Sequence, residues 1–158
     1  LVRYPEAYFL FITTEQQETI LKAAARIGVP SANLGVMAAT REDVPNAISL
    51  FDVSLFFIRP TYSKSASSPT KQGELMGMGK PIICNAGIGD TDEVIRKYHC
   101  GDVIDLNDEL SMDKAVAAFE QTRKLPADQI RRGAEDFYSL QKGIEKYGTI
   151  YRKFGLFS

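Results

Sequence analysis

The sequence predicts an α/β fold: a Rossmann-like, doubly wound parallel sheet of about five strands, with helices on both faces and further helices at the C-terminus. Three observations support this prediction. Short apolar runs alternate with segments of helical periodicity over about the first 110 residues. Residues 53–58 are apolar at nearly every position, as expected of a parallel strand buried on both faces. After the fifth apolar run, only helical patterns remain.

The expected strands are short runs that are rich in apolar and β-branched residues, with polar or glycine-containing segments at their ends. They occupy residues 8–13, 34–37, 53–58, 81–84 and 102–106. A helical pattern follows each run, as in the βαβ units of a parallel sheet.

The expected helix starts follow from capping residues. Thr14 with Gln17 and Thr40 with Asp43 have the spacing of capping boxes. The later helices are expected to begin at Pro69, Asp90, Ser111, Pro126 and Ser139.

The last helix carries four apolar residues at helical spacing, which we expect to face the core. They are Ile144, Tyr147, Tyr151 and Phe154.

Composition and charge limit the classes of function. The chain has 158 residues, of which 44% are hydrophobic and 25% charged, an ordinary composition for one globular domain spanning residues 1–158. The net charge is −1, so no basic excess is available to attract nucleic acid or a membrane surface.

The expected location is the cytoplasm. No apolar run approaches the roughly 20 residues that span a bilayer, and the N-terminal residues lack a signal-peptide pattern. Cys84 and Cys100 have no metal-ligand spacing and are interpreted as reduced core thiols. Leu1 in place of Met indicates a fragment of a longer protein.

The first candidate binding loop is residues 59–71, because ligands of an open parallel sheet sit beyond the carboxyl ends of its strands. It combines cations and hydroxyls with a helix N-terminus, whose free N–H groups attract anions. A solvated surface loop can have the same composition. The residues predicted to hold an anion are Arg59, Lys64, Ser67, Ser68, Thr70 and Lys71.

The second candidate loop is residues 85–90, where two glycines allow the backbone to approach a ligand closely. The alternative is a plain strand-to-helix turn that needs positive φ. Because both loops follow strands of one parallel sheet, we expect them to flank the same crevice.

Glu74 follows the first loop by about one helical turn. A carboxylate there can accept two hydrogen bonds from a vicinal diol, as the acidic residue of dinucleotide-binding folds does for a ribose. The alternative is a solvent-facing glutamate stabilised by the helix dipole.

Residues 67–90, SSPTKQGELMGMGKPIICNAGIGD, resemble the nucleotide-sugar-binding half of the GT-B glycosyltransferases, in their retaining "group 1" family. That family has a glutamate, a spacer, a second glutamate, small residues, Gly, a basic or small residue, Pro and a β run. The second half of this pattern is matched by Glu74, Gly79, Pro81, Ile82 and Ile83. Residues 43–60 and 137–154 also resemble the family's preceding strand and closing helices.

The resemblance implies a donor-binding domain that holds a nucleoside diphosphate sugar for transfer of the sugar to an acceptor hydroxyl, in polysaccharide or glycoconjugate synthesis. It implies that Glu74 binds the ribose and that the backbone around residues 69–71 holds the diphosphate. The loop Ala86, Gly87, Ile88 and Gly89 would lie beside the donor sugar.

The same resemblance implies chemistry by positioning and by neutralisation of the leaving diphosphate, without a bound metal or cofactor. No catalytic residue is assigned. A missing N-terminal domain would hold the acceptor and provide any membrane association, so the fragment alone is expected to be inactive.

The sequence departs from the family pattern at several positions. Ala66 stands where the family has its first glutamate. The family's basic pair for the phosphates is absent, which leaves the cations of residues 59–71 as local candidates. Thr13, Thr14 and Glu15 replace the usual glycine-rich turn.

The family's central first strand is also absent by this resemblance, so we expect residues 8–13 to pair directly with residues 53–58. This would give the flavodoxin-like strand order 2-1-3-4-5.

Two other functions remain open. A sugar-nucleotide epimerase of similar architecture would need an acid and a base in the site, for which His99 and Glu74 are poor candidates. A non-catalytic flavodoxin-like or receiver-like module is the second alternative, although only Glu15 supplies the acidic cluster of a receiver.

Overall fold

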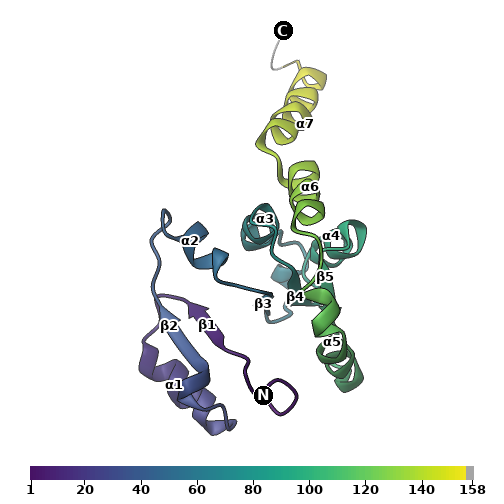
Figure 1. The fold of residues 1–158 in the computed structure, drawn as a ribbon. Helices are drawn as coiled ribbons and strands as arrows, with labels where there is room; N and C mark the ends of the chain where they lie inside the picture. The colour runs from purple at the N-terminus through teal and green to yellow at the C-terminus, as the bar shows by residue number, and fades with distance from the viewer. Residues whose placement is uncertain (156–158) are drawn as a thin grey trace. The chain divides into compact units, whose positions relative to one another are not determined.

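The structure is a computed structural model that describes residues 1–155, and the chain divides into two compact units, Leu1–Phe51 and Asp52–Ser158. Figure 1 shows the elements of each unit along the chain. No helix within residues 1–155 combines the length and apolar character needed to cross a bilayer.

The first unit is a two-stranded parallel sheet with its crossover helix (Figure 1). Strand β1 (Phe9–Ile12) pairs with β2 (Leu34–Met37), with Phe9 opposite Leu34. Helix α1 (Gln17–Arg26) and the short 3-10 helix η1 (Ser31–Asn33) connect the two strands, and α2 (Val44–Ser49) follows.

The second unit is a three-stranded parallel sheet in the order β3-β4-β5. Its strands are β3 (Ser54–Phe56), β4 (Ile82–Asn85) and β5 (Gly101–Ile104). The short 3-10 helix η2 (Tyr62–Lys64) lies between β3 and α3. The helices are α3 (Thr70–Gly77), α4 (Thr91–Tyr98), α5 (Glu109–Thr122), α6 (Ala127–Tyr138) and α7 (Leu140–Lys153).

The core of the second unit lies on both faces of β4, whose residues are all buried. Ile83 packs with Ile104 of β5 and Ala115 of α5 on one face. Ile82 and Cys84 point to the opposite face, because successive side chains of a strand alternate. Helices α3, α4 and α6 pack together, with Gly133 of α6 against Tyr98 and Met76. The structure therefore confirms a Rossmann-like α/β fold with parallel strands and helices on both faces.

The expected direct pairing of residues 8–13 with residues 53–58 would join the two units, and it stays a prediction. Within the first unit β1 pairs with β2, and within the second unit β3 pairs with β4. The prediction rests on two apolar edges whose polar groups could not remain buried without partners.

Two of the expected helix starts are wrong. Helix α1 begins at Gln17 with Gln16 as its N-cap, and not after Thr14. The neighbouring Thr13 Oγ1 accepts a hydrogen bond from Glu15 N–H at 3.1 Å. Helix α5 is capped by Asp108, while Ser111 Oγ accepts from Asp105 N–H at 2.9 Å. The starts after Pro69, Asp90, Pro126 and Ser139 are confirmed.

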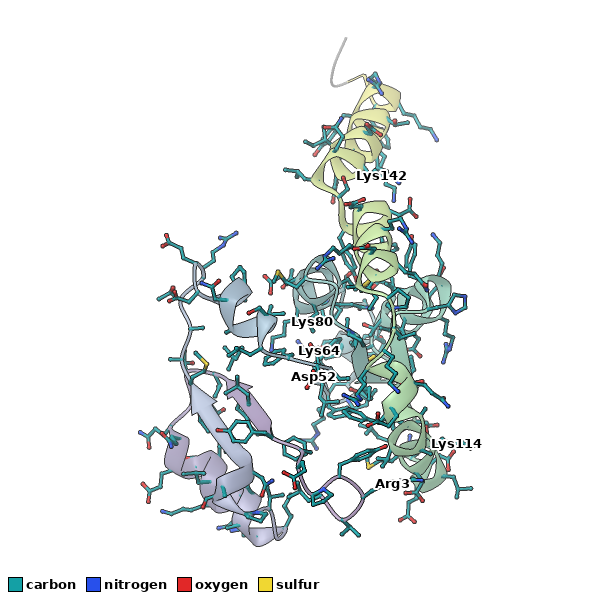
Figure 2. The ribbon with its side chains drawn as sticks, in the orientation of Figure 1. Arg3, Asp52, Lys64, Lys80, Lys114 and Lys142 are labelled. Carbon is teal, nitrogen blue, oxygen red and sulfur yellow. The ribbon has the colours of Figure 1, made fainter. Side chains whose placement is uncertain are left out.

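The stripe on the last helix does not face a core. Ile144, Tyr147, Tyr151 and Phe154 are all exposed. Helix α7 extends from α6 away from the sheet of its own unit (Figure 1). At the junction, which Figure 2 marks by Lys142, the Lys142 ammonium donates to Asp136. Tyr98 Oη donates to the other Asp136 carboxylate oxygen at 2.5 Å.

Both cysteines are free and buried, which confirms their interpretation as reduced core thiols. Burial raises the pKa of Cys84 to about 12 and that of Cys100 to about 11. Neither thiol is therefore ionised near neutral pH, and both act as small apolar side chains.

Replacement of Gly133 tests the packing of α6. An added Cβ would lie 2.9 Å from Tyr98 Cβ and 3.0 Å from Met76 Cε. Gly133→Ala should lower the free energy of unfolding by about 1–3 kcal/mol, because the helices must separate. Gly148→Ala is the matched control, since its Cβ meets no atom within 4 Å. It should raise stability by up to about 1 kcal/mol. Equal effects in urea unfolding would contradict this packing.

Acidification tests the attachment of α7. Hydrogen bonds from Lys142 and Tyr98 lower the pKa of Asp136 from 3.8 to about 2. A carboxyl group with a depressed pKa stabilises the fold above the unfolded-state value and loses this contribution as the pH falls through the folded-state value. The protection of α7 amides, measured against the intrinsic exchange rate at each pH, should therefore fall between about pH 4 and pH 2. The Asp136→Asn variant should lack that acid-dependent step, and an identical pH profile in both proteins would disprove the role of Asp136.

Candidate functional site

The two candidate loops lie against each other in the second unit. The β3–α3 connection (residues 57–69) and the β4–α4 connection (residues 86–90) follow neighbouring parallel strands. Ser68 Oγ donates to Asp90 Oδ2 at 3.2 Å. A Cβ added to Gly89 would lie 1.6 Å from the Ser67 carbonyl oxygen, so the two backbones are in close contact there. The sequence-based expectation that these loops share one location agrees with this geometry.

The N-terminus of α3 offers free hydrogen-bond donors. The helix begins at Thr70, and Gln72 N–H bonds the Pro69 carbonyl at 3.0 Å. The N–H groups of Thr70 and Lys71 have no partner among residues 1–155. Two donors at the positive end of a helix form a surface that favours an anion.

The first turn of α3 carries a positive charge and no negative one. Helices α1, α4, α5 and α6 each carry an acidic residue in the first turn, where the helix dipole favours it. Helix α3 has no acid there and instead has Lys71. A cation at this end is unfavourable unless an anion accompanies it.

The other cations of the first loop are also available to a ligand. Arg59, Lys64 and Lys71 are exposed, and none of them forms an ion pair with a described residue. Figure 2 marks Lys64 in the β3–α3 connection. Residues 59–71 contain no acid, and Asp90 is the carboxylate bonded to this loop. The local charge therefore favours an anionic ligand.

Glu74 lies in the second turn of α3, with its side chain exposed. Its carboxylate makes no hydrogen bond or ion pair with any other residue from 1 to 155, whereas its backbone carbonyl accepts from Met78 N–H at 3.0 Å. The preceding Gly73 fixes this part of the helix, because Tyr138 packs against it. A Cβ at Gly73 would lie 3.0 Å from Tyr138 Cγ. The Glu74 carboxylate is thus held on a packed helix and remains free to accept hydrogen bonds.

The apolar side chain and two backbone donors of the β4–α4 connection are already engaged within the protein. Gly87 and Gly89 have φ of +81° and +49°. The plain strand-to-helix turn with positive φ, which the sequence offered as the alternative to a binding loop, is therefore present. Ala86 N–H donates to the Ile104 carbonyl at 2.8 Å, and Gly87 N–H donates to Asp92 Oδ2 at 3.4 Å. The Ile88 side chain is buried. The Ile88 carbonyl accepts from Thr91 N–H at 3.0 Å. Within residues 1–155, the N–H groups of Ile88 and Gly89 are backbone donors of this loop that remain without a partner.

A layer of buried polar groups lies behind the two connections and was not found from the sequence. Gln72 Nε2 donates to the Thr91 carbonyl at 3.3 Å, which links the first turns of α3 and α4. Gln72 Oε1, Thr91 Oγ1 and the Tyr138 hydroxyl are buried without a partner among the described residues. Burial, together with the Asp90 carboxylate, raises the pKa of Tyr138. Gln72 could have been found, because its spacing from Leu75 and Met76 places it on the core face.

The described residues contain no group of three or more His, Cys, Asp or Glu side chains that could hold a metal ion. His99 is exposed at the end of α4 with φ of +49°, as expected of a turn residue.

Two surface pockets lie outside the two candidate loops. One of about 350 Å³ is beside Leu21 and Pro30, and one of about 420 Å³ is beside Arg96 and Thr122. Neither is lined by a predicted site residue.

The similarity to known proteins is limited to structure. No protein-family profile matches the sequence, and no curated protein matches it. Among solved structures, the chain is similar to WaaG, described as a glycosyltransferase involved in lipopolysaccharide biosynthesis. The TM-score is 0.65 and the sequence identity 20%, over 86% of this chain and 36% of that one. The chain therefore has a glycosyltransferase-like fold and spans about a third of the length of that protein.

The close contact of Gly89 with Ser67 predicts different effects for two glycine variants. Gly89→Ala and Gly87→Ala both put a side chain at positive φ, which costs about 1 kcal/mol or more. A Cβ at Gly87 meets no atom within 4 Å, whereas one at Gly89 collides with the Ser67 backbone. Only Gly89→Ala should therefore shift the backbone NMR resonances of residues 66–71. Similar shifts in both variants would contradict the contact.

Proposed function

We propose that this chain is the donor-binding part of a retaining GT-B glycosyltransferase of the group 1 family, and that it binds a nucleoside diphosphate sugar. The observation that carries the proposal is the first turn of α3. There, exposed Lys71 lies beside two N–H groups without a partner among residues 1–155, at a position where α1, α4, α5 and α6 have an acid. The glycosyltransferase-like fold supports the same assignment.

In the proposed complex, the diphosphate lies at the N-terminus of α3. Its oxygens accept hydrogen bonds from the N–H groups of Thr70 and Lys71, and the Thr70 hydroxyl is close enough in sequence to contribute. The Ser67 and Ser68 hydroxyls would contribute by exchanging their present acceptors, the Ser63 carbonyl and the Asp90 carboxylate, for the diphosphate. Lys71, Lys64 and Arg59 supply positive charge. Charge-assisted hydrogen bonds of this kind are about twice as strong as neutral ones.

Glu74 gives the site its preference for a nucleotide over a simple anion. Its carboxylate has two oxygens that can accept from the two hydroxyls of a ribose. A free carboxylate near a phosphate site is otherwise unfavourable, because like charges repel. We infer that the ribose diol separates Glu74 from the diphosphate and offsets that repulsion.

The proposed contribution to catalysis is positioning and electrostatic stabilisation. When the bond between the sugar and the diphosphate breaks, negative charge grows on the leaving phosphate oxygen. Lys71 and the α3 N–H groups stabilise that charge, and no metal is required in this proposal. The acceptor site would lie in a part of the protein outside this sequence, so we propose that residues 1–158 bind donor but do not complete transfer alone.

A ligand screen tests the proposed class directly. The melting temperature of the chain should rise with at least one of uridine, guanosine or adenosine diphosphate, because a ligand that binds only the folded state stabilises it. Inorganic phosphate at equal concentration should have a smaller effect. The absence of a shift with all three nucleotides would overturn the proposal.

Two variants separate the diphosphate from the ribose. Lys71→Gln should weaken binding of both inorganic pyrophosphate and the best nucleoside diphosphate in calorimetry. Glu74→Gln should weaken only the nucleotide, by about 1.5–3 kcal/mol, because pyrophosphate has no ribose. The exposed residues Lys114 of α5 and Glu135 of α6 provide matched controls, Lys114→Gln and Glu135→Gln. Unchanged nucleotide affinity in Glu74→Gln would refute the ribose assignment.

A further inference from the structure

Asn85 makes the most complete set of side-chain hydrogen bonds near the candidate site. It is the last residue of β4 and only 1% exposed. Its Oδ1 accepts from Ile58 N–H at 2.7 Å, and its Nδ2 donates to the Ile58 carbonyl at 2.9 Å. Nδ2 also donates to the Ala86 carbonyl at 3.1 Å. One side chain thus binds both backbone groups of a residue on the neighbouring connection.

These side-chain hydrogen bonds continue the link between the two chain segments beyond the end of the β3–β4 backbone ladder. The β3–β4 ladder ends with Phe56 opposite Cys84, and Ile58 follows two residues later. The next residue is Arg59, the first cation of the candidate binding loop, residues 59–71. Asn85 therefore fixes the point at which this loop leaves the sheet.

The far end of the same loop is fixed from the same short segment. Ser68 bonds Asp90, and the Ser67 carbonyl rests against Gly89. Residues 85–90 consequently hold both ends of the β3–α3 connection, which has few other constraints. Other hydrogen bonds of this connection are internal, such as Ser65 N–H to the Thr61 carbonyl and Ser67 N–H to the Lys64 carbonyl.

We infer that Asn85 is a positioning residue for anion binding, an inference that rests on the proposed function of the loop. It acts through Ile58, so that the cations and hydroxyls of residues 59–68 are already arranged before a diphosphate arrives. Preorganisation of this kind raises affinity because less entropy is lost on binding.

The chemistry of the side chain gives a specific test. A primary amide supplies one acceptor and two donors, whereas an ionised carboxylate supplies acceptors only. The Asn85→Asp variant should keep the bond from Ile58 N–H and lose both donated bonds. When its carboxyl group is protonated, one O–H is available again for the Ile58 carbonyl. Burial raises the pKa of such a group, so protonation should occur at mildly acidic pH.

The experiment compares pyrophosphate binding to the wild type, Asn85→Asp and Asn85→Leu by calorimetry at about pH 7.5 and about pH 5. At the higher pH both variants should bind about tenfold more weakly than the wild type. At the lower pH the deficit of Asn85→Asp should shrink, whereas that of Asn85→Leu should persist. Thr122→Val is the control, because it removes a buried hydroxyl that bonds Asp102, outside the loop. It should reduce stability without changing affinity.

Amide exchange separates this inference from the proposed function. Exchange of residues 58–68 should be faster in Asn85→Leu, and in Asn85→Asp at the higher pH, while exchange in α5 remains at the wild-type rate. If the wild type does not bind pyrophosphate, the proposed function fails and exchange alone decides the structural part of the inference. Wild-type affinity in both variants at the higher pH, or unchanged exchange of residues 58–68, would overturn the role of Asn85.

Discussion

The candidate site depends on the contact between two backbone segments, residues 66–68 and residues 86–90. The Ser67 carbonyl oxygen lies where a side chain of residue 89 would begin, so the arrangement requires glycine at that position. The Ser68–Asp90 hydrogen bond then fixes the residue that precedes Pro69. Because Pro69 leads directly into α3, this contact determines where the free N–H groups of the helix lie and, one turn later, where Glu74 lies.

This arrangement has a cost in stability. Buried polar atoms of Gln72 and Thr91 have no partner within residues 1–155. An unsatisfied buried polar atom costs about 1–3 kcal/mol. Lys71 adds an unfavourable charge at the positive end of α3. Unsatisfied groups are often found at functional sites. Gln72, Thr91 and Lys71 lie at the ends of the connections that follow β3 and β4.

Local patterns in the sequence were sufficient for most elements but not for their assembly. The β2 run, the start of α3 at Pro69 and the glycine turns follow from apolar periodicity and from residues with restricted φ. The pairing between the two units does not follow from local patterns, because it rests on which strand edges are buried. The prediction for the stripe of α7 was wrong for a related reason, since periodicity shows that a helix has an apolar side but not what covers it. The hydrogen bonds of Asn85 could not be predicted from local sequence, because their partner Ile58 lies 27 residues earlier in the chain.

The central claim is that this chain binds a nucleoside diphosphate where α3 begins. Its most direct test is NMR chemical-shift mapping of the isotope-labelled chain during titration with the nucleoside diphosphate that stabilises it most. The account predicts that the largest amide shifts occur in residues 67–74, with smaller ones in residues 87–90. Shifts centred on the pocket beside Arg96 and Thr122, or on the first unit, would contradict it.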